Sequence, residues 1–559
     1  MAGATSAAGQ GSAERAGRRR AHWAAVWLLT GLTAAAYSVF ALARYYTFHT
    51  GSYDLVIFDQ AVRSYAHFQP GISIIKGVHN GFGPHFSVLG DHWSPILAAL
   101  APLYWIYDSP QTLLVAQAVL FALAIPPLWL FTRRAFGGGQ RAVIAAYLVS
   151  VVYLLSWPIA AALAYNFHEV AFAPVLTAVA LERLQAGKLR TALIALAALL
   201  LVKEDMGLLV AGIGLYLLVA RPGVVPRQRL VAAAIIVAGI ADTVLATYVL
   251  IPAFGGRSDY YWAYTALGPN AGQALQHLIT HPASSLQVLI TPRVKLTTVL
   301  WLFGAFCFLP LRSPISLATI PLLLERMLGS VFPAWWGTAD QYNAFLVVVL
   351  VCAAVDGAAR LARSPLLARS RAGPAAAGSA GDTAAAGSAG DTGAAGSTGD
   401  TAAGSAGGTA AAGTAAATAD LGTVGLVCSV AMCAVALVLV PLFAFGSALH
   451  PSFYRRDARM NAAAAAVAAV PPGVTVEAVN HLGPQLSARD TVLLWDGDGS
   501  SPLRPPWVVA DVAKKEFTFA SRGQQIRRVA LLRRSGYQVV FSRDGYLVMH
   551  RSDARQAAG

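Results

Sequence analysis

Long apolar runs, separated by short polar connections, fill most of the first two-thirds of the chain. A helix needs about 20 predominantly apolar residues to cross the hydrocarbon core of a bilayer. Runs of this kind, some of them short, lie at 23–43, 111–132, 141–157, 167–182, 190–203, 206–220, 230–252, 294–310, 314–330, 341–360 and 421–447. The pattern predicts a mainly α-helical, polytopic transmembrane bundle with about eleven spans.

Small clusters of basic residues predict the side of the membrane that each connection faces. With the N-terminus inside, the cytoplasmic connections include Arg133-Arg134, Arg183, Lys188 and Arg360, whereas the opposite connections 158–166 and 331–340 carry no Lys or Arg. Because short cytoplasmic connections are enriched in basic residues, we predict an N-in, C-out topology. The same rule favours two spans at 190–203 and 206–220 over one bent helix, which would reverse every later span.

The apolar runs also divide the chain into segments. A basic cytoplasmic tail is expected at 1–22, a transmembrane bundle at 23–362 with outer loops at 44–110 and 253–292, a linker at 363–420 and a last transmembrane helix at 421–447. The linker is rich in Ala, Gly, Ser and Thr and contains almost no large apolar residue. Burial cannot offset its ordering entropy, so we predict a disordered cytoplasmic segment.

Residues 450–559 have the polar character of a soluble domain. Strand-like stretches lie at 474–476, 491–495, 507–510, 537–541 and 546–549, and helix-like stretches at 458–470 and 519–535. The turn Arg543-Asp544-Gly545 predicts a closing hairpin between the last two strands. We expect a small α/β domain on the extracytoplasmic side.

Composition agrees with a multi-pass protein of a bacterial plasma (inner) membrane. Of the 559 residues 56% are hydrophobic and only 12% are charged, against about 25% charged in soluble proteins. The formal net charge of +14 comes from clusters between apolar runs, without the basic stripe of a nucleic-acid-binding protein. The four cysteines lie in apolar runs, so no disulfide framework is implied.

The first outer loop is rich in polar residues. Asp54 and Asp59 lie in an aromatic and aliphatic stretch, and Asp59 would pair with Arg63 on a helix. A carboxylate beside a bound hydroxyl can take its proton, and two neighbouring carboxylates can instead hold a divalent cation. We take Asp54 and Asp59 as candidate catalytic residues. Apart from this candidate divalent cation no cofactor is assigned, its ligands are not specified, and the alternative is a surface loop with helix caps and one salt bridge.

Two further pairs are candidates for substrate binding. Asp91 and His92 end the first outer loop, where Asp91 would alternatively cap the following helix. His168 and Glu169 lie at the outer start of a span. Adjacent residues on a helix point about 100° apart, so one of this pair can bind while the other caps.

The remaining candidates for substrate binding are Lys203, Glu204, Asp205, Tyr342 and Asn343. Lys203 is a compact point charge suited to a phosphate, although the three charged residues would also neutralise one another at a surface corner. Tyr342 belongs to an aromatic cluster that would serve equally as an interfacial belt or as a sugar-stacking surface. All candidate clusters fall on the same predicted side, which favours one shared outward pocket.

Several motifs resemble a family of predicted membrane proteins known as domain of unknown function 2079. They are Tyr-Asp-Leu-Val-Ile-Phe-Asp-Gln at 53–60, Gly-Asp-His-Trp-Ser-Pro-Ile-Leu at 90–97, Asn-Phe-His-Glu at 166–169, Val-Lys-Glu-Asp at 202–205 and Asn-His-Leu-Gly-Pro-Gln-Leu-Ser at 480–487. The resemblance covers most of residues 25–360 and the tail. That family is similar in layout to GT-C-type glycosyltransferases, which implies a catalytic acid in the first outer loop and a polyprenyl-phosphate-linked sugar donor. Asp54 would then be the leading candidate base and Asp59 the second carboxylate.

Three functions remain open on the sequence. The first is a glycosyltransferase on the outer face that transfers sugar to an envelope glycan, lipid or protein, with Lys203 or His168 near the donor phosphate. The second is a lipid or solute transporter, for which Asp242 is the clearest intramembrane acid. The third is a non-catalytic envelope assembly or anchoring protein whose C-terminal domain does the work. No ATP-binding phosphate loop is present, which argues against an ATP-driven pump.

Overall fold

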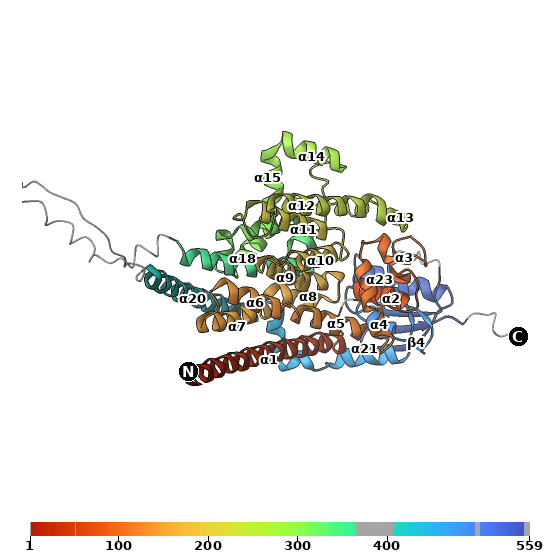
Figure 1. The fold of residues 1–559 in the computed structure, drawn as a ribbon. Helices are drawn as coiled ribbons and strands as arrows, with labels where there is room; N and C mark the ends of the chain where they lie inside the picture. Colours follow the sequence, from red (N-terminus) through yellow and green to blue (C-terminus); the bar gives the residue numbers. More distant parts are fainter. Residues whose placement is uncertain (1, 51, 365–405, 498–502, 553–559) are drawn as a thin grey trace, which may run out of the picture.

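The computed structural model describes residues 2–50, 52–364, 406–497 and 503–552 (Figure 1). Its main helices before the linker are α1 (Ala2–Tyr46), α2 (Ser52–Ala66), α3 (Ile74–His79), α4 (Ala101–Tyr104), α5 (Pro110–Ala122), α6 (Ile125–Ala135), α7 (Gln140–Leu154), α8 (Trp157–Tyr165), α9 (Phe172–Gln185), α10 (Leu189–Leu199), α11 (Met206–Val219) and α12 (Gln228–Leu245). They continue with α13 (Ile251–Ala253), α14 (Ala271–Thr280), α15 (Pro282–Ile290), α16 (Val294–Gly304), α17 (Ile320–Leu328) and α18 (Ala344–Ala362). After the linker come α20 (Ala406–Leu439), α21 (Ala458–Ala468), α22 (Gly483–Ser487) and α23 (Arg522–Arg534).

The predicted apolar runs coincide with helices of a mainly α-helical protein. Six helices in the described residues are long and apolar enough to cross a membrane: Ala16–Tyr46, Pro110–Ala135, Gln140–Tyr165, Gln228–Ala253, Gln341–Ala362 and Leu421–Leu442. The bent pair α15 and α16 would make a seventh, and α10 and α11 are shorter apolar helices. The runs at 190–203 and 206–220 are therefore separate helices, as the basic residues favoured.

Three predicted boundaries differ from the structure. The connection 158–166 is mostly helix α8, because Pro158 occupies the first turn, where its missing N–H costs nothing. Helix α1 begins at Ala2, inside the predicted tail, and α20 begins at Ala406, inside the predicted linker. Small residues such as alanine permit helix as readily as they permit coil. The rest of the linker, residues 365–405, lies outside the described residues.

Helices α11 and α12 pack closely through glycines. A Cβ atom added to Gly207 would lie 2.3 Å from the carbonyl oxygen of Gly239, and one added to Gly239 would lie 2.3 Å from that of Gly207. Only glycine permits backbones to approach so closely, as in many helix pairs of membrane proteins. This packing fixes the position of the α10–α11 turn, which carries Lys203.

The C-terminal domain contains a five-stranded mixed sheet in the order β2-β1-β3-β5-β4. The strands are β1 (Thr475–Ala478), β2 (Thr491–Leu494), β3 (Trp507–Asp511), β4 (Gln538–Arg543) and β5 (Tyr546–His550). Strand β1 pairs in parallel with β2 and β3, and the hairpin β4–β5 adds antiparallel pairing to β3. Asp544 and Gly545 both have positive φ, as the predicted hairpin turn requires. Each strand overlaps one expected from the sequence.

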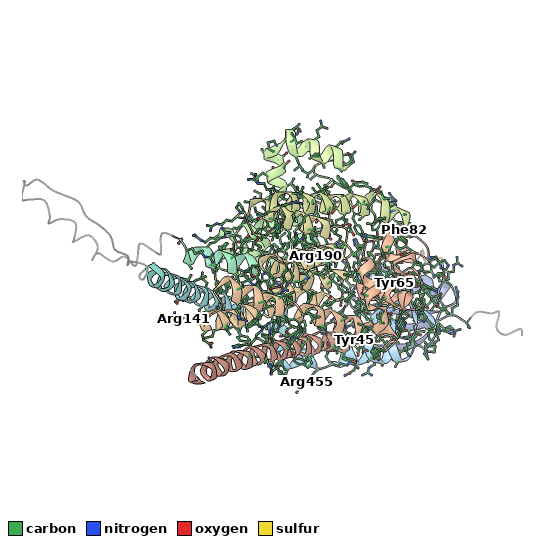
Figure 2. The ribbon with its side chains drawn as sticks, viewed as in Figure 1. Tyr45, Tyr65, Phe82, Arg141, Arg190 and Arg455 are labelled. Carbon is green, nitrogen blue, oxygen red and sulfur yellow. The ribbon has the colours of Figure 1, made fainter. Side chains whose placement is uncertain are left out.

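The C-terminal domain lies against the first loop, at one end of α1 (Figure 1). Figure 2 shows Tyr45 and Tyr65 at this end of the molecule and Arg141 at the other. Helix α2 contacts α22, and α3 contacts β2. The helix that carries Asp54 is therefore held between the helical bundle and the C-terminal domain.

Candidate active-site cavity

A polar cavity of about 200 Å³ collects most of the predicted site residues. Its lining includes Asp54, Asp91, His92, His168, Glu169, Lys203 and Tyr342. They come from α2, the end of the first outer loop, the segment between α8 and α9, the α10–α11 turn and the start of α18. Residues up to about 290 positions apart thus meet at one place, as the shared-pocket hypothesis requires.

Asp54 lies in the first turn of α2, where the helix dipole favours a negative charge. The Tyr165 hydroxyl donates a hydrogen bond of 3.0 Å to its Oδ2 atom. Its Oδ1 atom lies 3.9 Å from Nε2 of His168, and 31% of the side chain remains exposed. The carboxylate is therefore held in position while one oxygen stays accessible from the cavity.

His168 and Glu169 are buried beside Asp54 and titrate far from their ordinary ranges. Burial lowers the pKa of His168 to about 4, so its imidazole is neutral at pH 7. Burial likewise raises the pKa of Glu169 to about 7. Among the described residues neither Nδ1 of His168 nor Oε2 of Glu169 has a hydrogen-bond partner. Both atoms are therefore buried and unsatisfied, on residues that line the cavity.

The shifted pKa of Glu169 predicts a dependence of stability on pH. The unfolded chain releases this proton near pH 4.5 and the folded chain near pH 7. Between these values the folded state holds more protons, so stability falls as pH rises. The Glu169→Gln variant should lose this fall, which for one buried carboxyl is on the order of 3 kcal/mol. Denaturant titrations of detergent-solubilised protein at several pH values measure it.

The exposed Asp259→Asn variant is a matched control, because it removes a carboxylate that lies outside the cavity. Its free energy of unfolding should decrease with rising pH as in the wild type. Identical pH profiles for wild type and Glu169→Gln would contradict the assignment.

Lys203 lies on the turn between α10 and α11 and lines two cavities at once. Its Nζ atom is 3.3 Å from Oδ2 of Asp205. Burial acts to lower the pKa of Lys203, but the carboxylates of Asp205, Glu204 and Glu169 outweigh it and raise that pKa. The lysine therefore carries a full positive charge at neutral pH.

Glu204 fixes the end of the first outer loop. Its Oε1 atom lies 2.7 Å from Nδ1 of His92, and its Oε2 atom accepts the Trp93 N–H at 3.1 Å. Burial opposes ionisation, yet His92 and its hydrogen bond lower the pKa of Glu204 to about 2. Glu204 and Asp205 line the second cavity and not the first.

The second cavity, of about 260 Å³, is a cleft beside the polar one, with an apolar wall on one side and charged side chains on the other. Leu208, Val244, Tyr248 and Ile251 form the apolar wall. The residues that line both cavities are Asp91, His92, Lys203, Tyr261, Trp335 and Tyr342. Val244 and Tyr248 are more than half exposed on α12. The cleft therefore lies at the lateral surface of the bundle, where lipid would surround a membrane-embedded protein.

Asp91 is not the N-cap of the following helix, where Ser94 has that position, and it is not an isolated acid. Its Oδ1 atom lies 2.9 Å from Nζ of Lys76 and accepts a 2.7 Å hydrogen bond from the Tyr261 hydroxyl. The Lys76 ammonium also lies within 6 Å of the ring centres of Tyr53, Tyr260 and Tyr261. Lys76 and Tyr261 line the polar cavity, although the sequence did not select them. In the sequence they are a lysine in one loop and a pair of tyrosines in another, and these residues become neighbours only in the folded protein.

The structure does not bring Asp59 to the cavity. The side chain is fully buried, accepts two hydrogen bonds from Arg63, of 2.9 and 3.1 Å, and one of 2.8 Å from the Tyr104 hydroxyl. The Ser487 hydroxyl of the C-terminal domain donates a further hydrogen bond. With four donors around it, Asp59 has the geometry of a structural anchor. It is not placed to act as the second carboxylate beside Asp54.

Asn343 also lies outside the residues that line the two cavities. Its Oδ1 atom accepts hydrogen bonds of 3.1 Å from both terminal nitrogens of Arg326, and its Nδ2 atom donates to the Gly337 carbonyl. Arg326 in turn donates to the carbonyls of Trp335 and Tyr342. Asn343 therefore positions the loop that brings Trp335 and Tyr342 to both cavities.

The motif at 480–487 holds α2 and the end of α1. Asn480 Oδ1 accepts the Tyr53 N–H at 3.0 Å, one residue before Asp54. Gln485 donates to the carbonyl of Tyr45, and the Tyr45 hydroxyl donates to the Pro484 carbonyl. The C-terminal domain therefore contributes directly to the position of Asp54.

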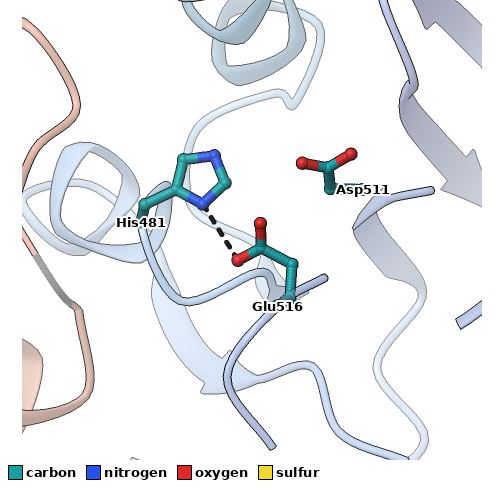
Figure 3. A group of neighbouring side chains, drawn as sticks. All are labelled: His481, Asp511 and Glu516. Atoms are coloured by element: carbon teal, nitrogen blue, oxygen red, sulfur yellow. Dashed lines mark hydrogen bonds and ion pairs between the residues drawn. The ribbon is translucent and has the colours of Figure 1, made fainter. Parts of the chain in front are cut away.

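A divalent cation finds no ligand set around Asp54 and Asp59, because the second carboxylate is fully engaged elsewhere. Within the described ranges, one His/Asp/Glu group has ligand atoms close enough for a metal ion: His481, Asp511 and Glu516 (Figure 3). His481 already lies 3.1 Å from Glu516 and 2.9 Å from the Tyr546 hydroxyl, and Asp511 pairs with Arg459. A guanidinium and two engaged imidazole nitrogens do not suit a metal site.

The fold and this cavity define a multi-pass membrane protein with a polar pocket beside a cleft that has one apolar wall. Residues 44–372 match the model of the predicted membrane protein family DUF2079. The chain belongs to this family, as its motifs indicated.

Two other comparisons add no functional assignment. No curated protein matches the sequence. Among solved structures, the crystal structure of ArnT from Cupriavidus metallidurans in the apo state matches at 12% sequence identity, covering 92% of this chain and 97% of that chain, with a TM-score of 0.40. A likeness at that level carries nothing about activity.

Proposed function

We propose that this protein is an inverting glycosyltransferase that uses a polyprenyl-phosphate-linked sugar. The observation that carries the proposal is the position of Lys203, the one Lys or Arg among the residues that line both the polar cavity containing Asp54 and the cleft whose apolar wall lies at the side of the bundle. A lipid-phosphate sugar has the same order of parts: an apolar tail, an anionic phosphate and a polar sugar. The two cavities fit this chemical class of donor and do not specify which sugar it carries.

In this arrangement the tail lies in the cleft along Leu208, Val244 and Tyr248. The phosphate lies beside Lys203, and the sugar occupies the polar cavity near Asp54 and His168. The neutral imidazole of His168 and the carboxyl of Glu169 supply hydrogen bonds to sugar hydroxyls. Aromatic side chains such as Trp335 and Tyr342 supply apolar surface for the sugar ring.

Asp54 acts as the general base in this mechanism. It takes the proton of an acceptor hydroxyl as that oxygen attacks the anomeric carbon. The bond from this carbon to the phosphate oxygen breaks, and polyprenyl phosphate leaves with the electron pair, stabilised by Lys203. The direct displacement inverts the anomeric carbon. The acceptor would be an envelope glycan, lipid or protein.

We further propose an N-in, C-out topology with about eleven spans in the plasma membrane, counting the short apolar helices. The distribution of basic residues supports this orientation. Arg141 at one end of the molecule and the first loop at the other are consistent with it (Figure 2). The cavity would then open on the outer side, where polyprenyl-linked sugars serve envelope assembly.

The Lys203→Gln variant should bind undecaprenyl phosphate at least about tenfold more weakly than wild type, because loss of a buried charge-assisted contact is worth about 1.5–3 kcal/mol. Titration of the lipid phosphate into nanodisc-embedded protein, followed by intrinsic tryptophan fluorescence, measures the affinity. The Arg257→Gln variant is a control, since Arg257 also lines the cleft but is largely exposed. Equal affinities for wild type and Lys203→Gln would remove Lys203 from the donor site.

A further inference from the structure

Helices α14 and α15 form a hairpin within the predicted outer loop 253–292. Residues 271–290 contain no Asp, Glu, Lys or Arg. Yet Leu275 and Ile279 are 59% and 71% exposed, and Leu286 and Ile290 are 59% and 48% exposed. An uncharged hairpin with four large aliphatic side chains uncovered is unusual at a surface that faces water.

On each helix the exposed large apolar residues lie on one face. Leu275 and Ile279 are one helical turn apart on α14, and Leu286 and Ile290 are one turn apart on α15. Gln273 is also exposed, but it lies about 160° around α14 from Leu275. Ala274 is buried toward the protein. The hairpin thus has an apolar face that no residue of the described chain covers.

The hairpin projects from the bundle beyond α12, on the side away from α1 (Figure 1). It lies at the level of the helical part and not beside the C-terminal domain. Helix α1 contains the apolar segment Ala16–Tyr46, which is long enough to span a membrane. A side chain that projects sideways at this level meets lipid before it meets solvent.

The apolar face continues into a helix of the bundle. Helix α15 meets α16 at an angle of 69°, and together they are long and apolar enough to count as one broken span. On α16, Leu296 and Leu300 are each 49% exposed and Trp301 is 40% exposed. These residues extend the uncovered apolar surface of the hairpin along the side of the bundle.

We propose that α14 and α15 form a lipid-embedded anchor, whose face of Leu275, Ile279, Leu286 and Ile290 lies in the bilayer beside the bundle. The absence of charge and the continuity with α16 favour lipid over a soluble partner. Burial of these aliphatic side chains in lipid removes their apolar surface from water and so stabilises the embedded position of the hairpin.

The anchor is joined to the loop that borders the cavities. The buried ammonium of Lys295 donates to the carbonyl of Val288 in α15, at 2.7 Å, and to those of Met327 and Gly329, at 2.7 and 2.8 Å. Gly329 precedes the segment that brings Trp335 to both cavities. The hairpin therefore ties this loop to the membrane, whether or not the chain transfers sugar.

Photo-crosslinking of the full chain in lipid nanodiscs tests the anchor. The Ile279→p-benzoylphenylalanine and Leu286→p-benzoylphenylalanine variants are irradiated in nanodiscs of radiolabelled phosphatidylcholine. Gln273→p-benzoylphenylalanine is the matched exposed site on the opposite side of α14. Val237 on α12, 66% exposed, and Ile526 on α23, 51% exposed, take the same probe as positive and negative controls.

Lipid adducts at 279 and 286 should match those at 237 and exceed those at 273 and 526 by about fivefold or more, as expected for an apolar face in the bilayer. Adducts at 279 and 286 that stay at the level of 526 would overturn the proposal. A crosslinked dimer in place of lipid adducts would also overturn it and assign the face to a second copy. Because the readout is lipid contact, it is independent of the proposed transferase activity.

Discussion

The Asp54→Asn variant should insert and fold normally but lose sugar transfer by about 10²–10⁴-fold, the usual contribution of a general base. Asparagine keeps the size of the side chain and still accepts the hydrogen bond from Tyr165, but it cannot take a proton from an acceptor hydroxyl. Accumulation of the unused polyprenyl-phosphate sugar in cells carrying the variant, measured by mass spectrometry of lipid extracts, reports the loss. No knowledge of the acceptor is needed.

The Asp108→Asn variant is a matched control, because Asp108 lies close to α2 but does not line the polar cavity. It should leave the lipid-linked sugars at wild-type levels. Undecaprenyl phosphate should bind Asp54→Asn as well as wild type, which separates catalysis from donor binding. Wild-type sugar levels in cells whose only copy is Asp54→Asn would remove Asp54 from the mechanism.

The Asp59→Ala variant should lower the free energy of unfolding by about 3–5 kcal/mol, as expected when one partner of a buried ion pair is removed. The substitution leaves Arg63, Tyr104 and Ser487 without their common acceptor. We expect the contact between α2 and the C-terminal domain to open first. Limited proteolysis of the detergent-solubilised protein, together with a thermal unfolding curve, measures both effects.

The comparison for Asp59 is Asp108→Ala, which removes the other acid bound by Arg63. The Asp108 side chain is 43% exposed, so this pair contributes only about 0–1 kcal/mol. Equal stability losses in the two variants would contradict the anchor role of Asp59.

The contacts between the C-terminal domain and α2 also change how the assembly hypothesis is tested. Deletion of residues 450–559 would remove Asn480 and Ser487, which hold α2 next to Asp54. Such a deletion would abolish function whether the protein is a transferase or an assembly protein. Only the point variant Asp54→Asn distinguishes them, because it leaves the C-terminal domain intact.

Much of the architecture follows from short-range patterns. The length of an apolar run determines whether a helix can cross a bilayer, and alternation with turn residues specified all five strands of the C-terminal domain. Several cavity residues were also selected from the sequence. His168, Glu169 and Lys203 could be selected because charged and imidazole groups are costly in an otherwise apolar protein and are kept mainly where they have a function.

Helix ends in low-complexity segments were less predictable. Helix α20 begins at Ala406, in a stretch whose composition suits both coil and helix. The connection at 158–166 was expected to be a loop, but Pro158 begins a new helix there. Both stretches are rich in alanine, the residue with the highest helix propensity, so a composition of small residues was a poor guide to a loop or a linker.

By itself, the sequence determined that this protein is a membrane-embedded helical bundle with a small mixed-sheet domain and a set of retained polar residues. Only the tertiary structure decided which of those residues share a cavity. Asp54 and Asp59 are five positions apart and point about 140° apart on α2, so one faces the cavity while the other binds Arg63 and Ser487. Their flanking residues are equally apolar, and the two roles depend on which elements pack against each face of the helix.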